Sequence, residues 1–131
     1  MVVDSSALVA ILQAEAEAPA LAKAIEDDPV RLVSAASFLE TSIVIEARHF
    51  EAGALKLDSL IRKTKLEVVA VSAEQAEIAR DAWRRFGKGR HPANLNFGDC
   101  FSYALAKDRG ERLLFVGEDF SKTDLERVPL N

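Results

Sequence analysis

The sequence predicts an α/β fold in which a mostly parallel central sheet of four to five strands carries helices on both faces. Short apolar runs alternate with segments of helical periodicity, and the connections between them are short. Such alternation places successive strands parallel in one sheet, with the helices packed against it. The chain has 131 residues, 49% of them hydrophobic and 29% charged, so we expect one globular domain spanning residues 1–131.

The first half of the chain is expected to contain two strands, at residues 1–4 and 30–33, where short apolar runs occur. Apolar residues at helical spacing then predict four helices, at residues 6–14, 19–27, 37–50 and 55–61. Pro19 suits the first position of the second helix. Gly53 is expected to separate the third helix from the fourth.

The second half repeats the alternation. Residues 66–71 form the clearest strand by composition, and Ser72 with Gln75 resembles a capping box that starts a helix ending near Phe86. Two glycines and a proline predict a loop over residues 87–96. Asn96 is expected to cap a helix over residues 97–108, followed by a strand at 113–116 and a last short strand at 127–130.

Acidic residues recur at the ends of the expected strands and at the starts of the helices that follow. Asp4 ends the first strand, Glu40 and Asp99 fall in the first turns of expected helices, and Asp119, beside Glu118, follows a late strand. These positions share one edge of a parallel sheet, where ligands bind. Two carboxylates about 4 Å apart repel by roughly 4 kcal/mol at an effective dielectric near 20. The cluster therefore predicts a hard divalent cation, Mg²⁺ or Mn²⁺.

Each acid also has a local structural explanation. Asp4 can cap the following helix, as the serines after it also can, and Glu40 fits a capping box with Ser37. Asp99 can interact favourably with a helix dipole, and Asp119 can be an ordinary turn residue. One shared site explains all four positions together, so we favour it.

Positive charge is local, because the net charge of −4 gives no overall signature of nucleic-acid binding. The densest basic stretch runs from Arg80 to His91, and its candidate RNA contacts are Arg84, Arg85, Lys88 and Arg90. A smaller basic group consists of Arg62, Lys63 and Lys65. If both groups flank the acidic edge, the protein has a negative centre between two positive surfaces. A merely solvated basic surface is the alternative.

The single cysteine, Cys100, excludes an intramolecular disulfide and a zinc site built from cysteines, and we expect it to be a buried core thiol. No apolar stretch has the length of a membrane span, and Asp4 interrupts the first apolar run. These features indicate a soluble cytoplasmic protein with no membrane partner.

Four sequence motifs, in this order and at these spacings, resemble those of the PIN-domain ribonucleases. They are VDSSAL at residues 3–8, a serine- and glutamate-containing segment at 34–40, LNFGDCF at 95–101 and LFVGEDF at 114–120. More narrowly, the chain resembles the VapC toxins of bacterial toxin–antitoxin pairs, and the resemblance covers essentially its whole length.

The resemblance implies roles for particular residues. Asp4, Glu40 and Asp99 match the three core acids of the family, which are both catalytic and metal-binding, and Asp119 matches a fourth, less uniform acid. Ser6 matches a small polar residue that supports the metal ligands. Glu118 stands directly before Asp119, which leaves open which of the two faces the metal.

The resemblance also implies a cofactor and partners. The family uses Mg²⁺ or Mn²⁺ to hydrolyse structured cellular RNA such as tRNA or rRNA, which inhibits translation. A cognate VapB-type antitoxin would neutralise the toxin. We expect a homodimer, a possible hetero-oligomer with the antitoxin, and contact with DNA only through that antitoxin.

Two other functions remain open from the residues. A receiver-like phosphoacceptor domain also places aspartates around Mg²⁺, but it needs adjacent acids after the first strand, where this chain has Ser5 and Ser6. It also needs an acceptor aspartate after a middle strand, where this chain has Ser72. A catalytically silent RNA-binding module on the PIN fold is the second alternative, although the complete set of acids argues against it.

Overall fold

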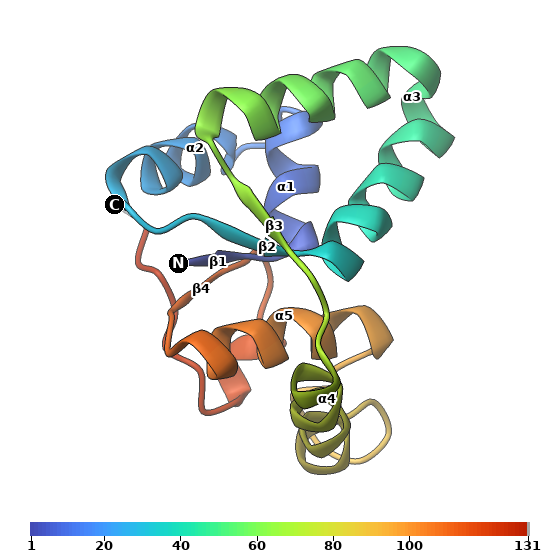
Figure 1. The fold of residues 1–131 in the computed structure, drawn as a ribbon, viewed down its shortest axis with the longest axis vertical. Coiled ribbons are helices and arrows are strands. Elements are labelled where there is room, and N and C mark those ends of the chain that lie inside the picture. The colour runs from blue at the N-terminus through green and yellow to red at the C-terminus, as the bar shows by residue number, and fades with distance from the viewer. Residues whose placement is uncertain (131) are drawn as a thin grey trace.

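A four-stranded parallel sheet forms the centre of the computed structural model, which describes residues 1–130 (Figure 1). The strands are β1 (Val2–Val3), β2 (Leu32–Ser34), β3 (Glu67–Val69) and β4 (Leu113–Leu114), in the order β3-β2-β1-β4. β1 is central, and Val2 pairs with both Leu32 and Leu113. The predicted α/β class and the parallel sheet are confirmed.

Helices cover both faces of this sheet. They are α1 (Ser5–Leu12), α2 (Ala18–Asp27), α3 (Ala35–Thr64), α4 (Ala73–Phe86) and α5 (Phe97–Arg109), with a 3₁₀ turn, η1, at Phe120–Lys122. In Figure 1, α1, α2 and α3 lie above the sheet and α5 lies below it, with α4 packed against α5. None of the helices over residues 1–130 is both long and apolar enough to span a membrane.

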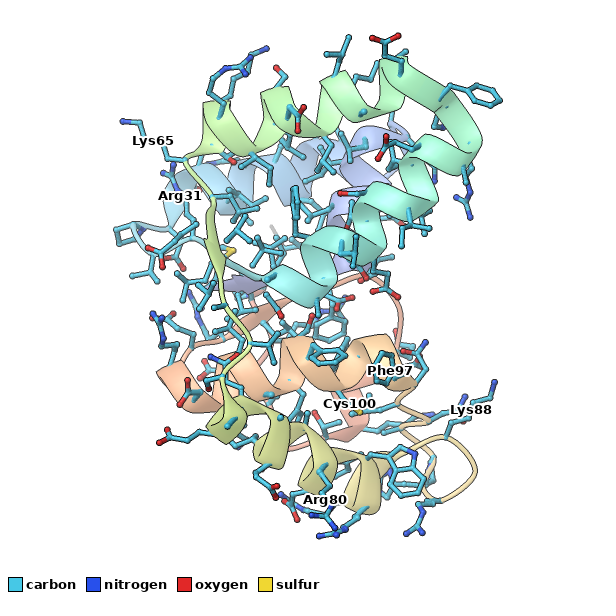
Figure 2. All side chains as sticks on the ribbon, turned by 45° about the vertical axis from the view of Figure 1, so that its right-hand side comes forward. Arg31, Lys65, Arg80, Lys88, Phe97 and Cys100 are labelled. Atoms are coloured by element: carbon cyan, nitrogen blue, oxygen red, sulfur yellow. The ribbon has the colours of Figure 1, made fainter. Side chains whose placement is uncertain are left out.

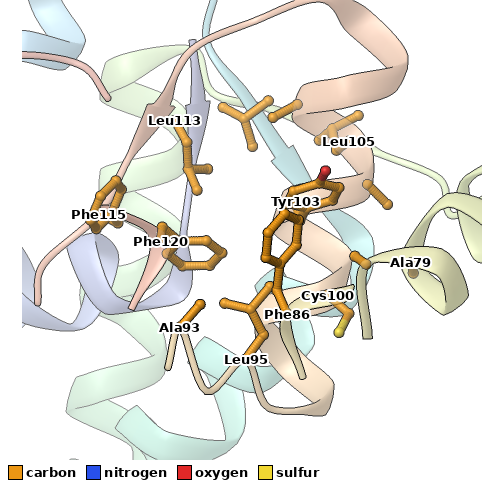
Figure 3. Close-up of a cluster of buried hydrophobic side chains, with 14 of the residues drawn as sticks. Ala79, Phe86, Ala93, Leu95, Cys100, Tyr103, Leu105, Leu113, Phe115 and Phe120 are labelled. Carbon is orange, nitrogen blue, oxygen red and sulfur yellow. The ribbon is translucent and has the colours of Figure 1, made fainter. Parts of the chain in front are cut away.

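Alternation along the strands divides the interior into two cores. Val2 packs with residues of α4 and α5, whereas Val3 packs with residues of α1 and α2. Because side chains alternate across a strand, one short strand supplies both cores. Figure 3 shows the α5 side, where Tyr103 and Phe86 lie at the centre; their ring centroids are 5.8 Å apart. Cys100 is buried in this core, as expected, and burial raises the pKa of its thiol to about 11.

The break predicted at Gly53 lies earlier in the chain, at Phe50. The two expected helices are the two arms of α3, which meet at Phe50, where the backbone is not helical: φ is 55° and ψ is −141°. Gly53 is helical and buried, and a β-carbon there would lie 2.6 Å from the Cγ2 atom of Ile45 and 2.8 Å from its carbonyl oxygen. Gly53 therefore allows the two arms of α3 to approach each other after the bend.

The last predicted strand is reduced to a single bridge. Arg127 pairs with Leu113 beside β4, and the backbone N–H of Val128 donates to the Leu113 carbonyl at 2.9 Å. The segment extends the hydrogen bonding at this edge without adding a regular fifth strand.

Candidate active site

All four predicted acids lie at the carboxyl edge of the sheet. In Figure 1 the strands run from left to right, and α1, α3 and α5 all begin at the right-hand side. Asp4 follows β1, Glu40 lies on α3 after β2, Asp99 is in the first turn of α5, and Asp119 follows β4. Parallel pairing therefore brings together residues from both ends of the chain.

Asp4 is a buried carboxylate, 2% exposed, held from two sides. One oxygen, Oδ2, accepts the backbone N–H of Ser6 at 3.0 Å and so caps α1, which means that the capping explanation and the site explanation both hold. The other, Oδ1, accepts the hydroxyl of Ser102 at 2.5 Å. Ser102 lies 3.0 Å from the Ser37 hydroxyl, so a chain of hydroxyl groups links α3 and α5 to the end of β1. Hydrogen bonds to a charged group offset part of the cost of burying it.

Glu40 does not form the capping box considered for it. α3 is capped by the Ser34 hydroxyl, which accepts the N–H of Ala36, so Glu40 lies in the second turn of the helix rather than the first. Ser37 points into the core instead. Glu40 Oε1 accepts the hydroxyl of Ser5 at 2.7 Å, a contact that holds the carboxylate beside the start of α1.

Asp99 caps a helix and is also affected by the negative charges of the other acids. It forms a reciprocal capping box with Asn96: Asp99 Oδ2 accepts the Asn96 N–H at 3.0 Å, and Asn96 Oδ1 accepts the Asp99 N–H at 2.9 Å. Burial, together with the negative charges of Asp4, Asp119 and Glu40, raises the pKa of the Asp99 carboxyl to about 7 against the lowering effect of the Asn96 hydrogen bond. The charges of the other three carboxylates thus all reach Asp99.

Asp119 is the acid of the last turn that faces the cluster. Its charge contributes to the raised pKa of Asp99, whereas the exposed Glu118 carboxylate accepts the hydroxyl of Ser121 at 3.1 Å. Ser6 connects this turn to α1, because its hydroxyl accepts the backbone N–H of Val116 at 3.1 Å. These contacts favour Asp119 over Glu118 as the metal-facing acid.

The donor set fits a hard divalent cation. All candidate ligand atoms are carboxylate oxygens, and their mutual repulsion is expressed at Asp99. Within residues 1–130, no three His, Cys, Asp or Glu side chains are grouped so that they could hold a metal ion as they stand. Mg²⁺ does not require such a group, since it commonly binds through one or two carboxylates and retains several waters. The residues present therefore fit an open site better than a closed structural one.

Three serines that support the acids were not predicted as part of the site: Ser102 and Ser37 behind Asp4, and Ser5 behind Glu40. Ser102 had a recognisable signal, since it stands three residues after Asp99 on the same helical face. The contact between Ser5 and Glu40 joins residues 35 positions apart, and no local pattern encodes it.

The basic candidates divide into two kinds. Arg84 and Lys88 are exposed, and neither makes an ion pair within the described part of the chain. Arg85 is already engaged, with Asp81 and Asp124 each 3.6 Å away. The guanidinium of Arg90 stacks 4.3 Å from the centre of the Trp83 ring. Arg84, Lys88 and Arg90 thus suit contact with RNA phosphates better than Arg85 does.

The second basic group lies at the wrong edge to flank the acids. Lys65 directly precedes Leu66 and β3, so it lies at the amino edge of the sheet, and it lines a cavity with Arg31 and Arg109. Figure 2 shows Arg31 and Lys65 on one side of the molecule and Phe97 and Lys88 on the other. Of the two predicted basic groups, the loop before α5 is the one that leads to the acidic edge.

Comparison with known proteins agrees with this arrangement. The PIN domain family model matches residues 1–126. Ribonuclease VapC of Mycolicibacterium smegmatis is 57% identical over 98% of this chain and 99% of its own length. The chain belongs to the VapC ribonucleases of the PIN-domain family. Ribonuclease VapC30 of Mycobacterium tuberculosis is 54% identical, over 99% of both chains.

A solved structure supports the fold of this VapC-family chain. VapC20 of Mycobacterium tuberculosis, described as a toxin that cleaves the sarcin-ricin loop, aligns with a TM-score of 0.78 over 98% of each chain at 23% identity. The predicted resemblance to VapC toxins is confirmed, and the receiver-like alternative is set aside.

Proposed function

We propose that this VapC-family chain is a Mg²⁺- or Mn²⁺-dependent ribonuclease that hydrolyses phosphodiester bonds in structured cellular RNA and thereby inhibits translation. The observation that carries the metal dependence is the convergence of four acids at the carboxyl edge of the parallel sheet, where burial and the charges of the other three raise the pKa of Asp99. A bound divalent cation would relieve this repulsion, stabilise charge that develops on the phosphate oxygens and acidify an attacking water.

The residues of the chain divide the remaining work. Asp4, Glu40, Asp99 and Asp119 are the proposed ligands, with Asp4 fixed by Ser102 and by the start of α1. Glu40, held by Ser5, is placed to orient or deprotonate the attacking water. Lys88 and Arg90, in the loop that leads to α5, would bind flanking phosphates.

The proposed substrate class is argued from the chemistry of the site and from similarity to related proteins. An open, acid-lined edge with basic residues in the loop that leads to α5 suits an exposed RNA loop, the form of RNA that proteins read most readily. The sarcin-ricin loop named for VapC20 is such a target, and tRNA is the other candidate. The proposed location is the cytoplasm, where these RNAs are found.

The proposed partners follow from family membership and from the surface. The family name implies a VapB-type antitoxin, with DNA reached only through it. Leu39, Ile43 and Phe97 are large apolar residues exposed around the acidic edge, Phe97 at 80%. Apolar surface of this kind marks protein contacts, so we propose a homodimer that can join the antitoxin in a hetero-oligomer.

The decisive experiment incubates purified protein with rRNA and with tRNA in EDTA, Mg²⁺ or Mn²⁺, beside Asp99→Asn as the control. We expect cleavage only with metal and only by the parent protein. Metal-dependent binding of RNA without cleavage would instead identify a catalytically silent PIN module. Cleavage that persists in EDTA or in the Asp99→Asn variant would overturn the proposed site.

A further inference from the structure

Gly98 stands where an ordinary helical residue would be expected. It lies in the first turn of α5, directly before Asp99, and its backbone φ is not in the left-handed region that favours glycine. Glycine in a helix is destabilising relative to alanine, because it loses more conformational freedom on folding. The reason for a glycine at this position must therefore be space rather than backbone geometry.

That space is filled by the Glu40 carboxylate. A β-carbon on residue 98 would lie 2.5 Å from Glu40 Oε2, 2.8 Å from Oε1 and 2.9 Å from Cδ, all closer than real contacts allow. On its other side, Oε1 accepts the Ser5 hydroxyl at 2.7 Å. The carboxylate is thus confined between the backbone of α5 and the start of α1.

We propose that Gly98 and Ser5 form a slot that positions Glu40 toward the Asp4 and Asp99 carboxylates. Both are positioning residues, since each acts through Glu40. This role rests on the proposed ribonuclease function, for which Glu40 orients the attacking water. The Glu40 charge contributes to the raised pKa of Asp99, which independently places the confined carboxylate near the cluster.

An added methyl group at residue 98 should displace Glu40 and leave the fold intact. The atoms in its way belong to the free end of a flexible side chain and not to the backbone. A largely apolar surface cavity of about 310 Å³ adjoins the slot beside the exposed Leu39, Ile43 and Phe97, so the displaced carboxylate has room to turn toward solvent. Alanine also favours the helix more than glycine does.

The test compares Gly98→Ala and Ser5→Ala with the parent protein, using Ser42→Ala as the control. Ser42 also loses a hydroxyl in its variant, but that hydroxyl donates only to the Phe38 carbonyl within α3. Calorimetry measures the melting temperature without metal and the affinity for Mn²⁺, and single-turnover assays measure RNA cleavage. We expect Gly98→Ala to melt no lower than the parent and to lose about 10- to 100-fold in Mn²⁺ affinity or cleavage, the usual effect of removing the support of a metal ligand. Ser5→Ala should lose in the same way, whereas Ser42→Ala should lose neither.

A shorter side chain at residue 40 tests whether the effect of Gly98→Ala is specifically due to its contact with Glu40. Glu40→Asp withdraws the carboxylate from residue 98 by one methylene, so the methyl of Gly98→Ala no longer meets it. In the Glu40→Asp background, adding Gly98→Ala should therefore change Mn²⁺ affinity and cleavage by less than about twofold. Equal losses from Gly98→Ala in the parent and in the Glu40→Asp background would overturn the slot. So would a Gly98→Ala variant that keeps the parental activity and Mn²⁺ affinity. A markedly lower melting temperature of Gly98→Ala would overturn it as well.

Failure of the slot and failure of the ribonuclease function have different signatures. If the parent cleaves RNA and Asp99→Asn does not, the proposed function is supported. The slot is then tested by the double-mutant cycle made of the parent, Gly98→Ala, Glu40→Asp and the variant with both substitutions. If the parent does not cleave RNA, the function fails. The Mn²⁺ affinities of the four proteins in the cycle then still decide whether Gly98 acts through Glu40.

Discussion

Among the single residues of the site, Asp99 combines three properties. Its side chain caps α5, is partly buried and lies near three other carboxylates. We expect Asp99→Asn and Asp4→Asn to abolish RNA cleavage, by more than about 100-fold, since each removes a proposed metal ligand rather than an outer support. The amide oxygen can still accept the capping hydrogen bond, so the circular dichroism spectrum should remain parental. Full cleavage by either purified variant would exclude its residue from the site.

The raised pKa of Asp99 also predicts how metal affinity depends on pH. A carboxyl with a pKa of about 7 is largely protonated at pH 6, and a proton must leave before it can bind a cation. Mn²⁺ affinity should therefore rise as the pH rises from 6 to 8, and proton release on binding should be largest near pH 6. Calorimetry in buffers of different ionisation enthalpy measures both. An affinity independent of pH would contradict metal binding by an Asp99 carboxyl with a raised pKa.

The same shift makes the metal-free protein less stable at alkaline pH. The carboxyl has a pKa of about 7 when folded and near 3.9 when unfolded, so between these values the folded state binds more protons. The stabilisation from protonated Asp99 is complete below pH 4 and is lost as the pH rises through 7. Urea denaturation in EDTA should show a larger fall in stability from pH 5.5 to pH 8 for the parent than for Asp99→Asn. Equal falls would contradict the assigned pKa.

At the scale of elements, the bend in α3 stores backbone strain. Phe50 has a φ of 55° and a side chain that is 75% exposed, so it has an unfavourable backbone conformation and little packing to offset it. Phe50→Gly should raise the free energy of unfolding by about 1 kcal/mol, the lower end of the cost of such a conformation. The control is Leu55→Gly, an exposed helical position on the second arm of α3, which should lower it by about 1 kcal/mol. If both variants are destabilised alike, Phe50 is not strained.

This bend marks the limit of what the sequence alone could predict about the elements. The strands and most helices follow from apolar runs, helical spacing and capping residues such as Asn96, all of which are local. The bend at Phe50 is imposed by packing between the two arms of α3, and a phenylalanine carries no signal for a positive φ. Gly53 did carry a signal, but its cause was close packing rather than a break.

The candidate site divides in the same way. The four acids could be placed because parallel strands end at a common edge, which depends only on the order of the elements. The contacts of the supporting serines could not be predicted: the spacing of Ser102 from Asp99 indicates a shared helical face, but the Ser102–Asp4 contact joins residues 98 positions apart. The location of the Arg62–Lys65 group could not be predicted from the sequence either, because it depends on the direction of the second arm of α3 after the bend.

At the scale of the whole molecule, the separation of the two basic groups gives a prediction with an internal control. Lys88 and Arg90 precede α5 at the acidic edge, whereas Arg62 and Lys63 lie at the end of α3, next to the opposite edge. Removing one cation that binds a phosphate should reduce the slope of log affinity against log salt by about 0.7 for single-stranded RNA. The Lys88→Ala/Arg90→Ala variant should therefore bind RNA more weakly, with a flatter salt dependence and unchanged Mn²⁺ affinity.

The control for that variant is Arg62→Ala/Lys63→Ala, which removes the same charge from the other side of the molecule. Its RNA affinity and salt slope should match those of the parent in a filter-binding or anisotropy titration. Equal weakening by both double variants would mean that RNA is attracted by total charge and not by the loop before α5.

The central position of β1 has a consequence for the time at which the protein can become active during its own synthesis. Val2 pairs with Leu113, and Asp4 lies at the same edge of the sheet as Asp119. The acidic site can therefore form only after nearly the whole chain has been synthesised. Contacts of such long sequence separation form late, after the intervening chain is available. A nascent chain that has emerged only as far as α4 holds Asp4 and Glu40 but lacks Asp99, Asp119 and the hydroxyl of Ser102. Under the proposed function, the incomplete chain would therefore be unable to cleave the RNA of the ribosome that is still making it.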